Sequence, residues 1–571
     1  MPGDHASAEL LAAMGSLLIT VRDVPLRLDT PGIDEARETQ AAVTDQLSDY
    51  VLPRLVQLDA PLLAVVGGST GAGKSTLVNS LVGERVTESG VLRPTTRSPV
   101  LVHHPDDAAW FQPDRILPDL PRTLAIGNDS YALRLASSAK IPKGLAILDA
   151  PDVDSIDKGN RDLAAQLLAA ADLWLFVTSA ARYADQVPWD YLRQAAERST
   201  SVAVVLDRTS DEAVIEVRGH LARMMTSRGL SDSPLFTVPE SGLDADGLLP
   251  ADAVAPMVGW LHELAADPKA RQMVVHRTLD GAVRHVVLRT HDVADALDAQ
   301  IEVAESLYRD AETIQRKELD ELATQTSDGT LLRGEVLASW QEFVGTGELL
   351  KSVEEKVSRI RDRFVDGMTG KRTRSTEVVD AIETAVHMLL VEHAESAAEQ
   401  IARSWGGSTP GRQMLDRQRG LDRASQDFRV KAERTVHDWR QSVLELVRVE
   451  GADKRMTARF LAFGVNGIAV ALMIVMFSRS TDGTGAGGTA TLGRKLLDAI
   501  FGEAVVDDLV ERAHADLDSR VAALFETELH RFHTLLDPPE TLKIVQATLR
   551  EAARKAEYAR HADFLDGETT S

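Results

Sequence analysis

Residues 61–81 constrain the fold more than any other part of the chain. They begin with an apolar run at 62–66, of the kind found in buried parallel strands. A glycine-rich turn follows, and then a helix-forming segment that carries Leu77 and Leu81 on one face. The sequence therefore predicts a strand, a tight turn and a helix in succession, which is typical of an α/β domain.

The turn fits the pattern GxxxxGK[ST] without a mismatch, because residues 68–75 read GSTGAGKS. Its glycines let backbone N–H groups converge on a phosphate chain, and the following helix adds its positive N-terminus. Lys74, on an exposed loop, is expected to hold the β- and γ-phosphates, and the Ser75 hydroxyl is expected to ligate Mg²⁺. An ordinary strand–helix turn is the alternative, which the flanking pattern disfavours. The predicted phosphate-binding residues are Gly68, Ser69, Thr70, Gly71, Ala72, Gly73, Lys74, Ser75 and Thr76.

Length and composition limit the classes of protein that fit. With 571 residues, two to four domains are expected, and a net charge of −24 disfavours nucleic acid as a partner. The absence of cysteine excludes disulfides, zinc–thiolate sites and cysteine nucleophiles. Asp4 and Glu9 stand where a secretory signal has basic residues, so we expect a cytoplasmic catalytic part.

Proline placement divides the chain into an α/β head and a helical body. Of the 22 prolines, all but Pro410, Pro538 and Pro539 lie at or before Pro268. Because proline interrupts helix interiors, the later half is expected to form long helices. The predicted parts are N-terminal helices packing on the head or neck (1–59), a P-loop domain (60–268), a helical stalk (269–450), a hydrophobic segment with a glycine-rich turn (451–500) and a C-terminal helix returning to the stalk, with a tail (501–571).

Two segments of the head match the places where P-loop proteins hold Mg²⁺. Thr96 is expected to be the switch threonine that reaches Mg²⁺ and orients the attacking water, with Thr95 as the alternative. The apolar run 144–148 ends in Asp149, which is predicted to hold the Mg²⁺ water shell. In the GTPase pattern DxxG, Asp152 occupies the glycine position, where its carboxylate repels a γ-phosphate unless it is turned away or paired with the metal.

Further strands are expected at 172–178, 202–206 and 234–238, with helices between them. This alternation predicts a doubly wound, mostly parallel sheet of about six strands. The base-recognition motif [NT]KxD is expected after residue 206, where the chain reads Asp207, Arg208, Thr209 and Ser210. Asp207 and Arg208 are therefore the candidate base-side residues, and both GTP and ATP remain possible ligands.

Apolar residues recur at helical spacing through the second half, for example in 283–308, 375–402 and 423–448, which predicts a helical bundle or coiled-coil stalk. Residues 460–477 are 18 residues without a charge. Six basic and two acidic residues lie in the flanks between 451 and 495. The segment is therefore predicted to contact an anionic membrane, as a short span or an inserted tip, and a buried bundle helix is the alternative.

With these motifs, the chain resembles the bacterial dynamin-like GTPases of actinobacteria. The P-loop, the Thr-Arg-x-Pro step that begins at Thr96, and Asp149 carry the likeness. The resemblance implies a GTPase head, a helical neck and trunk, a lipid-binding paddle, and nucleotide-driven assembly on membranes as a homo-oligomer or with a paralogue. Thr70 stands where dynamins often place a catalytic glutamine, so it is a candidate catalytic residue beside Lys74 and Thr96. A membrane-coupled P-loop ATPase and a nucleotide-gated scaffold are the alternative functions.

Overall fold

Two compact units make up the chain in the computed structural model. One contains residues 1–27, 31–299 and 542–571, and the other contains residues 28–30 and 300–541. We call them the head unit and the helical unit. The structure describes residues 2–88, 98–113, 115–118, 120–123, 132–155, 157–197, 200–210, 212–344, 365–452, 458–478 and 487–565.

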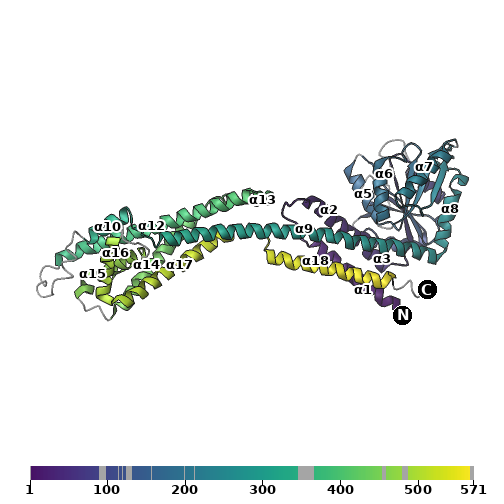
Figure 1. Ribbon diagram of the computed structural model, residues 1–571. Helices are drawn as coiled ribbons and strands as arrows, with labels where there is room; N and C mark the ends of the chain where they lie inside the picture. The colour runs from purple at the N-terminus through teal and green to yellow at the C-terminus, as the bar shows by residue number, and fades with distance from the viewer. Residues whose placement is uncertain are drawn as a thin grey trace. The chain divides into compact units, whose positions relative to one another are not determined.

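An eight-stranded sheet forms the centre of the head unit (Figure 1), in the order β3-β4-β2-β5-β1-β6-β7-β8. All neighbouring strands are parallel except β2 and β5. The strands are β1 (Leu62–Gly68), β2 (Val100–His103), β3 (Arg122–Thr123), β4 (Leu133–Ser137), β5 (Leu145–Asp149), β6 (Leu173–Ser179), β7 (Ser201–Thr209) and β8 (Leu235–Pro239). The predicted mostly parallel, doubly wound sheet is confirmed, with eight strands where about six were expected.

Helices cover both faces of the sheet because successive residues of β1 point to opposite sides. Leu63 and Val65 pack with residues of α5, α6 and α7, whereas Leu62, Ala64 and Val66 pack with residues of α4 and α8. Both sides of β1 are buried, which explains its uninterrupted apolar sequence. These helices are α4 (Lys74–Val82), α5 (Lys158–Ala169), α6 (Gln186–Glu197), α7 (Val214–Ser227) and α8 (Ala251–Ala266), and a short η2 (Pro105–Phe111) follows β2.

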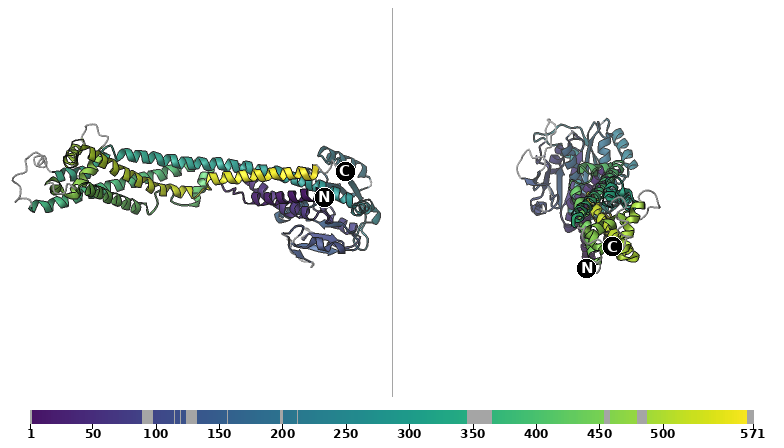
Figure 2. Two further views of the ribbon diagram at one scale, coloured as in Figure 1. Left: turned by 90° about the horizontal axis from the view of Figure 1, so that it is seen from below. Right: turned by 90° about the vertical axis from the view of Figure 1, so that its left-hand side faces the viewer.

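The head unit also contains helices from both ends of the chain, which lie beside the first part of a long helix. Figure 2 shows the yellow α18 running along the teal α9, and Arg550 and Arg560 of α18 form ion pairs with aspartates of α9. A π-helical turn precedes Pro53, which lacks an N–H and cannot continue the regular pattern. The helices are α1 (Pro2–Arg22), α2 (Ile33–Gln46), η1 (Leu47–Val51), α3 (Leu52–Val56), α9 (Pro268–Gln325), α18 (Pro539–Arg560) and η5 (His561–Leu565).

A buried polar network joins α3 and α9 to the sheet. The carboxylate of Asp172, just before β6, accepts hydrogen bonds from Leu63 N at 2.8 Å and from the Tyr50 hydroxyl at 3.1 Å. The same carboxylate pairs with the Arg54 guanidinium at 3.0 Å. The Thr278 hydroxyl of α9 donates to the backbone carbonyl of Asp172 at 3.0 Å. Asp172 thus connects β1 and β6 with η1, α3 and α9.

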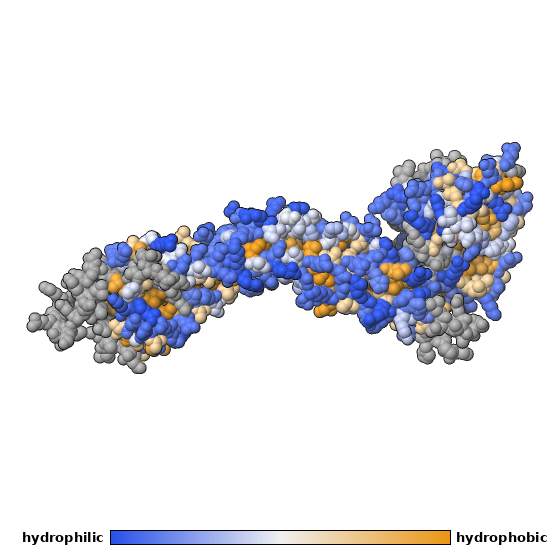
Figure 3. All heavy atoms as spheres, in the orientation of Figure 1, coloured by the Kyte–Doolittle hydropathy of each residue, from blue (hydrophilic) through white to orange (hydrophobic). Residues whose placement is uncertain are grey.

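The helical unit is held together by one large apolar core that draws side chains from nearly all of its described helices. Trp340, Phe428, Trp439 and Phe525 are among its fully buried residues. The visible face of both units is largely hydrophilic, with apolar residues scattered over it (Figure 3). The elements of this unit besides the end of α9 are η3 (Thr330–Leu332), α10 (Glu335–Val344), α12 (Val365–Gly406), α13 (Thr409–Arg417), α14 (Phe428–Glu450), α15 (Ala458–Met476), α16 (Gly487–Phe501) and α17 (Glu503–His533).

The hydrophobic segment predicted to contact a membrane lies inside this core. It forms α15, whose backbone breaks at Gly464 (φ 65°), and residues 468–477 are all less than 9% exposed. They pack against α12, α14, α16 and α17. The prediction of membrane contact is therefore wrong for this part of the segment, and the alternative of a buried bundle helix holds. None of the helices in the described ranges is both long and apolar enough to cross a membrane.

Candidate nucleotide-binding site

The glycine-rich loop connects β1 to α4 at the carboxyl edge of the parallel strands. Gly68, Gly71 and Gly73 have φ angles of 148°, 73° and 91°, which residues with a Cβ rarely adopt. A Cβ on Gly68 would lie 2.0 Å from the backbone oxygen of Val177, so only glycine fits there. This strand, loop and helix in a doubly wound sheet define the head as a domain of the P-loop NTPase fold.

Lys74 is buried at the start of α4 rather than displayed on an exposed loop, since it is only 5% exposed. Its ammonium donates to the backbone oxygens of Gly68 at 3.1 Å and Ser69 at 3.0 Å. Its third partner is the carboxylate of Asp152, which is itself nearly buried. An ammonium has three N–H groups, so the protein itself can engage all of them. The sequence suggested that the Asp152 carboxylate is turned away from the γ-phosphate or paired with the metal. In the structure it is instead paired with Lys74.

Asp149 ends β5 and is completely buried beside the P-loop helix. Its Oδ2 accepts hydrogen bonds from the Ser75 hydroxyl at 2.7 Å and the Thr87 hydroxyl at 2.8 Å. Its Oδ1 has no hydrogen-bond partner among the described residues. Burial raises the pKa of Asp149, and the two hydroxyl hydrogen bonds oppose this shift. A buried carboxylate oxygen with spare capacity beside a serine hydroxyl is a donor set that fits Mg²⁺, which prefers oxygen ligands.

Thr87 is a residue of this site that the motifs did not indicate. The side chain of Asn79 in α4 fixes it, because Asn79 Oδ1 accepts from the N–H groups of Val86 and Thr87, both at 2.9 Å. Asn79 Nδ2 also donates to the Thr87 carbonyl at 2.9 Å. The predicted switch residue Thr96, with its alternative Thr95, lies outside the described residues.

Asp154 forms a second contact between the segment after β5 and the P-loop. Its Oδ1 accepts from Thr70 N at 2.6 Å and from the Thr70 hydroxyl at 2.7 Å. Its Oδ2 accepts from Arg182, which follows β6, at 2.9 Å. Thr70, the candidate catalytic residue, is therefore held by a carboxylate that an arginine neutralises. Neither Asp154 nor Arg182 belongs to a motif, and only the folded chain brings them to the loop.

The candidate base-side residues lie at the end of β7, where the strand carries a register shift. Arg208 has a φ of 53°, which is uncommon for a residue with a side chain. Asp207 is 4% exposed, and burial raises its pKa to about 6. A Cβ on Gly73 would lie 2.2 Å from Asp207 Oδ2, so this carboxylate packs directly on the P-loop. The structure thus places the candidate base-side residue Asp207 against the glycine-rich loop that was predicted to bind phosphate.

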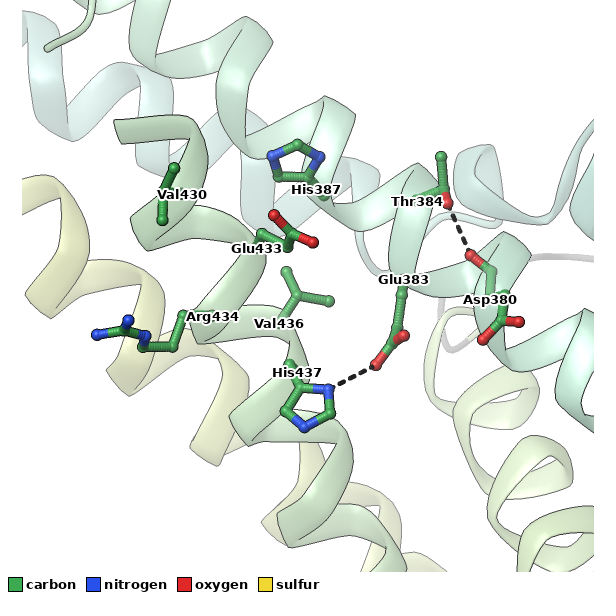
Figure 4. Close-up of a pocket in the computed structure, with 9 residues that line it drawn as sticks. All are labelled: Asp380, Glu383, Thr384, His387, Val430, Glu433, Arg434, Val436 and His437. Carbon is green, nitrogen blue, oxygen red and sulfur yellow. Dashed lines mark hydrogen bonds and ion pairs between the residues drawn. The ribbon is translucent and has the colours of Figure 1, made fainter. Parts of the chain in front are cut away.

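A groove in the helical unit is a second place where polar side chains gather. It has a volume of about 590 Å³ and lies between α12 and α14 (Figure 4). Glu383 faces it but pairs with Arg440 at 3.1 Å and with His437 at 3.8 Å. These contacts bridge the two helices and give Glu383 a structural role. The lining residues are Asp380, Glu383, Thr384, His387, Val430, Glu433, Arg434, Val436 and His437.

Glu318, Glu321 and His393 form a cluster in which one ligand-type atom of each lies within 4.8 Å of the others. Both oxygens of Glu318 are already engaged. One accepts from His393 Nδ1 at 2.6 Å, and the other accepts from Ser396 at 3.0 Å and Gln400 at 2.6 Å. This buried network satisfies its members and ties α9 to α12. We assign it a structural role.

No protein-family model matches the chain. A curated relative from Arabidopsis thaliana, the probable transmembrane GTPase FZO-like, chloroplastic, is 24% identical over 182 residues, which cover 30% of this chain and only 19% of the relative. The match therefore spans about a fifth of the relative's length.

Two solved structures of an oligomerised bacterial dynamin pair, described as sensing and tethering membranes at long range, also match. They are 9% and 10% identical, with TM-scores of 0.41 and 0.42. The alignments cover 94% and 98% of this chain and 96% and 100% of theirs.

Proposed function

We propose that the protein binds a nucleoside triphosphate with Mg²⁺ at the P-loop and hydrolyses it, with GTP as the expected substrate. The observation that supports this most is the arrangement around α4. A buried Lys74 and the Ser75 hydroxyl lie at the helix N-terminus, and beside them lies Asp149, one oxygen of which has no hydrogen-bond partner in the described part of the chain. Ammonium, helix N-terminus and metal-type ligands together suit a polyphosphate.

Each residue has a definable part in the proposed reaction. Lys74 neutralises charge that develops on the phosphates, and the N–H groups at the start of α4 hold the phosphate chain. Ser75 and Asp149 are the residues that would hold Mg²⁺, which supplies further neutralisation of the phosphate oxygens. Thr96 is proposed to orient the attacking water, as the motif resemblance implies. Asp207 and Arg208 are proposed to lie on the base side of the site.

A nucleotide-gated scaffold with little turnover is the second candidate. The observation that favours it is the ion pair between Lys74 and Asp152, because the ammonium has to exchange its carboxylate partner before it can act on a γ-phosphate. The preference for guanine rests on the resemblance, since the motif after β7 departs from [NT]KxD.

Coupling of nucleotide hydrolysis to a membrane and to self-assembly is the wider part of the proposal. It rests on the motif resemblance and on a curated relative that is described as a transmembrane GTPase. The buried face of α15 does not contribute to this contact, so a peripheral contact through other residues is proposed.

Titration of GTP and of ATP, each in the presence and absence of Mg²⁺ and each with measured turnover, tests the proposal. The expected result is Mg²⁺-dependent binding and hydrolysis of GTP that Lys74→Ala removes. Lys143→Ala is the matched control, because Lys143 is an exposed lysine of the same unit that pairs only loosely with Asp106, at 3.8 Å. Binding without turnover would favour the scaffold, and equal nucleotide affinity in the Lys74 variant would refute the assignment of the P-loop.

A further inference from the structure

The segment after β5 lies directly along the P-loop. Ala150 N donates to the Val66 carbonyl at 3.2 Å, and Val153 N donates to the Gly68 carbonyl at 3.4 Å. These contacts hold the backbone of the segment against the end of β1. The carboxylates of Asp152 and Asp154 both reach the loop from this position.

The two carboxylates bind groups that a phosphate chain would use. Asp152 pairs with the Lys74 ammonium, and Asp154 accepts from the backbone N–H of Thr70. Their charges are balanced differently, because Asp154 also pairs with Arg182 whereas the partner of Asp152 is Lys74 itself. Asp152 therefore competes directly with any phosphate that approaches this ammonium.

Because the Lys74 ammonium is buried, Asp152 and an incoming phosphate compete for it. A buried ammonium needs an anionic partner in every state, since an uncompensated buried charge is strongly unfavourable. Asp149 is also buried close by, so the carboxylates of Asp149 and Asp152 both lie near the Lys74 ammonium before any ligand arrives. A further anion placed at Lys74 without displacement of Asp152 would meet two like charges at short range.

We propose that Asp152 is a specificity-determining residue that acts as an internal competitor of the γ-phosphate, so that it lowers the affinity for nucleoside triphosphates relative to diphosphates. The proposal rests on the proposed function, because it requires nucleotide binding at this loop. A diphosphate brings only its β-phosphate to Lys74, and the N–H groups at the start of α4 carry most of its binding, so Asp152 is only partly displaced from the ammonium. A triphosphate brings a further charged group to Lys74 and has to displace the carboxylate.

The experiment compares fluorescent GDP with a non-hydrolysable fluorescent GTP analogue in the presence of Mg²⁺. Asp152→Asn keeps the size of the side chain and removes its charge. It is expected to tighten binding of the GTP analogue at least about tenfold and to change GDP affinity less than about threefold. Asp246→Asn is the matched control, because it removes an exposed carboxylate of the same unit and is expected to move neither affinity.

Asp152→Gly serves as a second variant, and the wild-type protein gives an independent measurement. Wild type is expected to bind GDP at least as tightly as the GTP analogue. Equal gains for both nucleotides in the variants, weaker binding of the analogue, or a wild-type preference for the analogue above about tenfold would overturn the inference alone. A failure of every variant and of wild type to bind either nucleotide would overturn the proposed function together with it.

Discussion

The hydroxyls of Ser75 and Thr87 donate to one and the same oxygen, Oδ2 of Asp149, at 2.7 and 2.8 Å. This sharing leaves the second oxygen of the carboxylate unengaged among the described residues. The two hydroxyls fix the orientation of a buried carboxylate at the place proposed for Mg²⁺. Thr87 is therefore a positioning residue, although no motif includes it.

Thr87→Val is expected to weaken Mg²⁺-dependent nucleotide binding by about tenfold or more, because a hydrogen bond to a charged group contributes about 1.5–3 kcal/mol. The half-maximal Mg²⁺ concentration for binding of GDP measures the effect. Thr226→Val, in which an exposed hydroxyl on α7 is removed, is the control and is expected to leave that concentration unchanged. An unaltered Mg²⁺ requirement in the Thr87 variant would contradict the positioning role.

Lys74→Ala is expected to lower stability as well as nucleotide binding. Removal of one partner of a buried ion pair leaves Asp152 uncompensated and typically costs about 3–5 kcal/mol. The double variant with Asp152→Asn should recover most of the free energy of unfolding but none of the binding. Urea melts of both variants beside nucleotide titrations measure this, and a double variant no more stable than the single one would argue against the pairing.

Asp207 gives a pH dependence of stability whose sign follows from its pKa. The folded value of about 6 lies above the unfolded value of 3.8, so the native state holds the proton more tightly. Its contribution to stability is greatest below pH 3.8 and is lost as the pH rises to about 6. Asp207→Asn should therefore stabilise the protein at pH 8, by at most about 3 kcal/mol, and have little effect near pH 4. Urea melts at the two pH values test this, and a destabilised variant at pH 8 would contradict it.

Aspartate substitutions in α15 test whether the apolar segment belongs to the core. Val470 and Ile474 are fully buried, so the double change to Asp should destabilise the helical unit by more than about 4 kcal/mol. Nucleotide binding by the head unit should persist under conditions where it remains folded. Val449→Asp, at a position of α14 that is 62% exposed, is the control and should leave the thermal melt nearly unchanged. Release from anionic vesicles without a change in the melt would instead support insertion into lipid.

Local patterns were sufficient to predict much of the head. The strand, loop and helix around Lys74 follow from residue types over a short stretch, and Asp149 follows from the end of a buried strand. Thr87, Asp154 and Arg182 could not be predicted because each enters the site through a contact distant in sequence, and none belongs to a pattern that fixes its partner. The pairing of Asp152 with Lys74 could not be predicted for the same reason, because the two residues are far apart in the sequence.

The apolar segment was misinterpreted because hydropathy does not distinguish lipid from protein core. The basic residues that flank it extend to Arg494 and Lys495. Arg494 pairs with Asp498 at 3.2 Å and with Asp507 at 2.6 Å, and both aspartates follow the flank that ends at residue 495. The apparent excess of positive charge is therefore partly neutralised by the next turns of the chain.

The hydrogen bonds of Thr278 give α9 a fixed axial register against the head sheet. Its hydroxyl donates to the Asp172 carbonyl and accepts from Ser201 N at 3.3 Å, so one side chain bridges the beginnings of two neighbouring strands. Apolar surfaces can slide past one another with little penalty, whereas hydrogen bonds are directional and lose their geometry within a fraction of a helical turn. A shift of these strand ends would therefore displace the start of α9 along its axis, because the two hydrogen bonds hold the helix to the strands at one point.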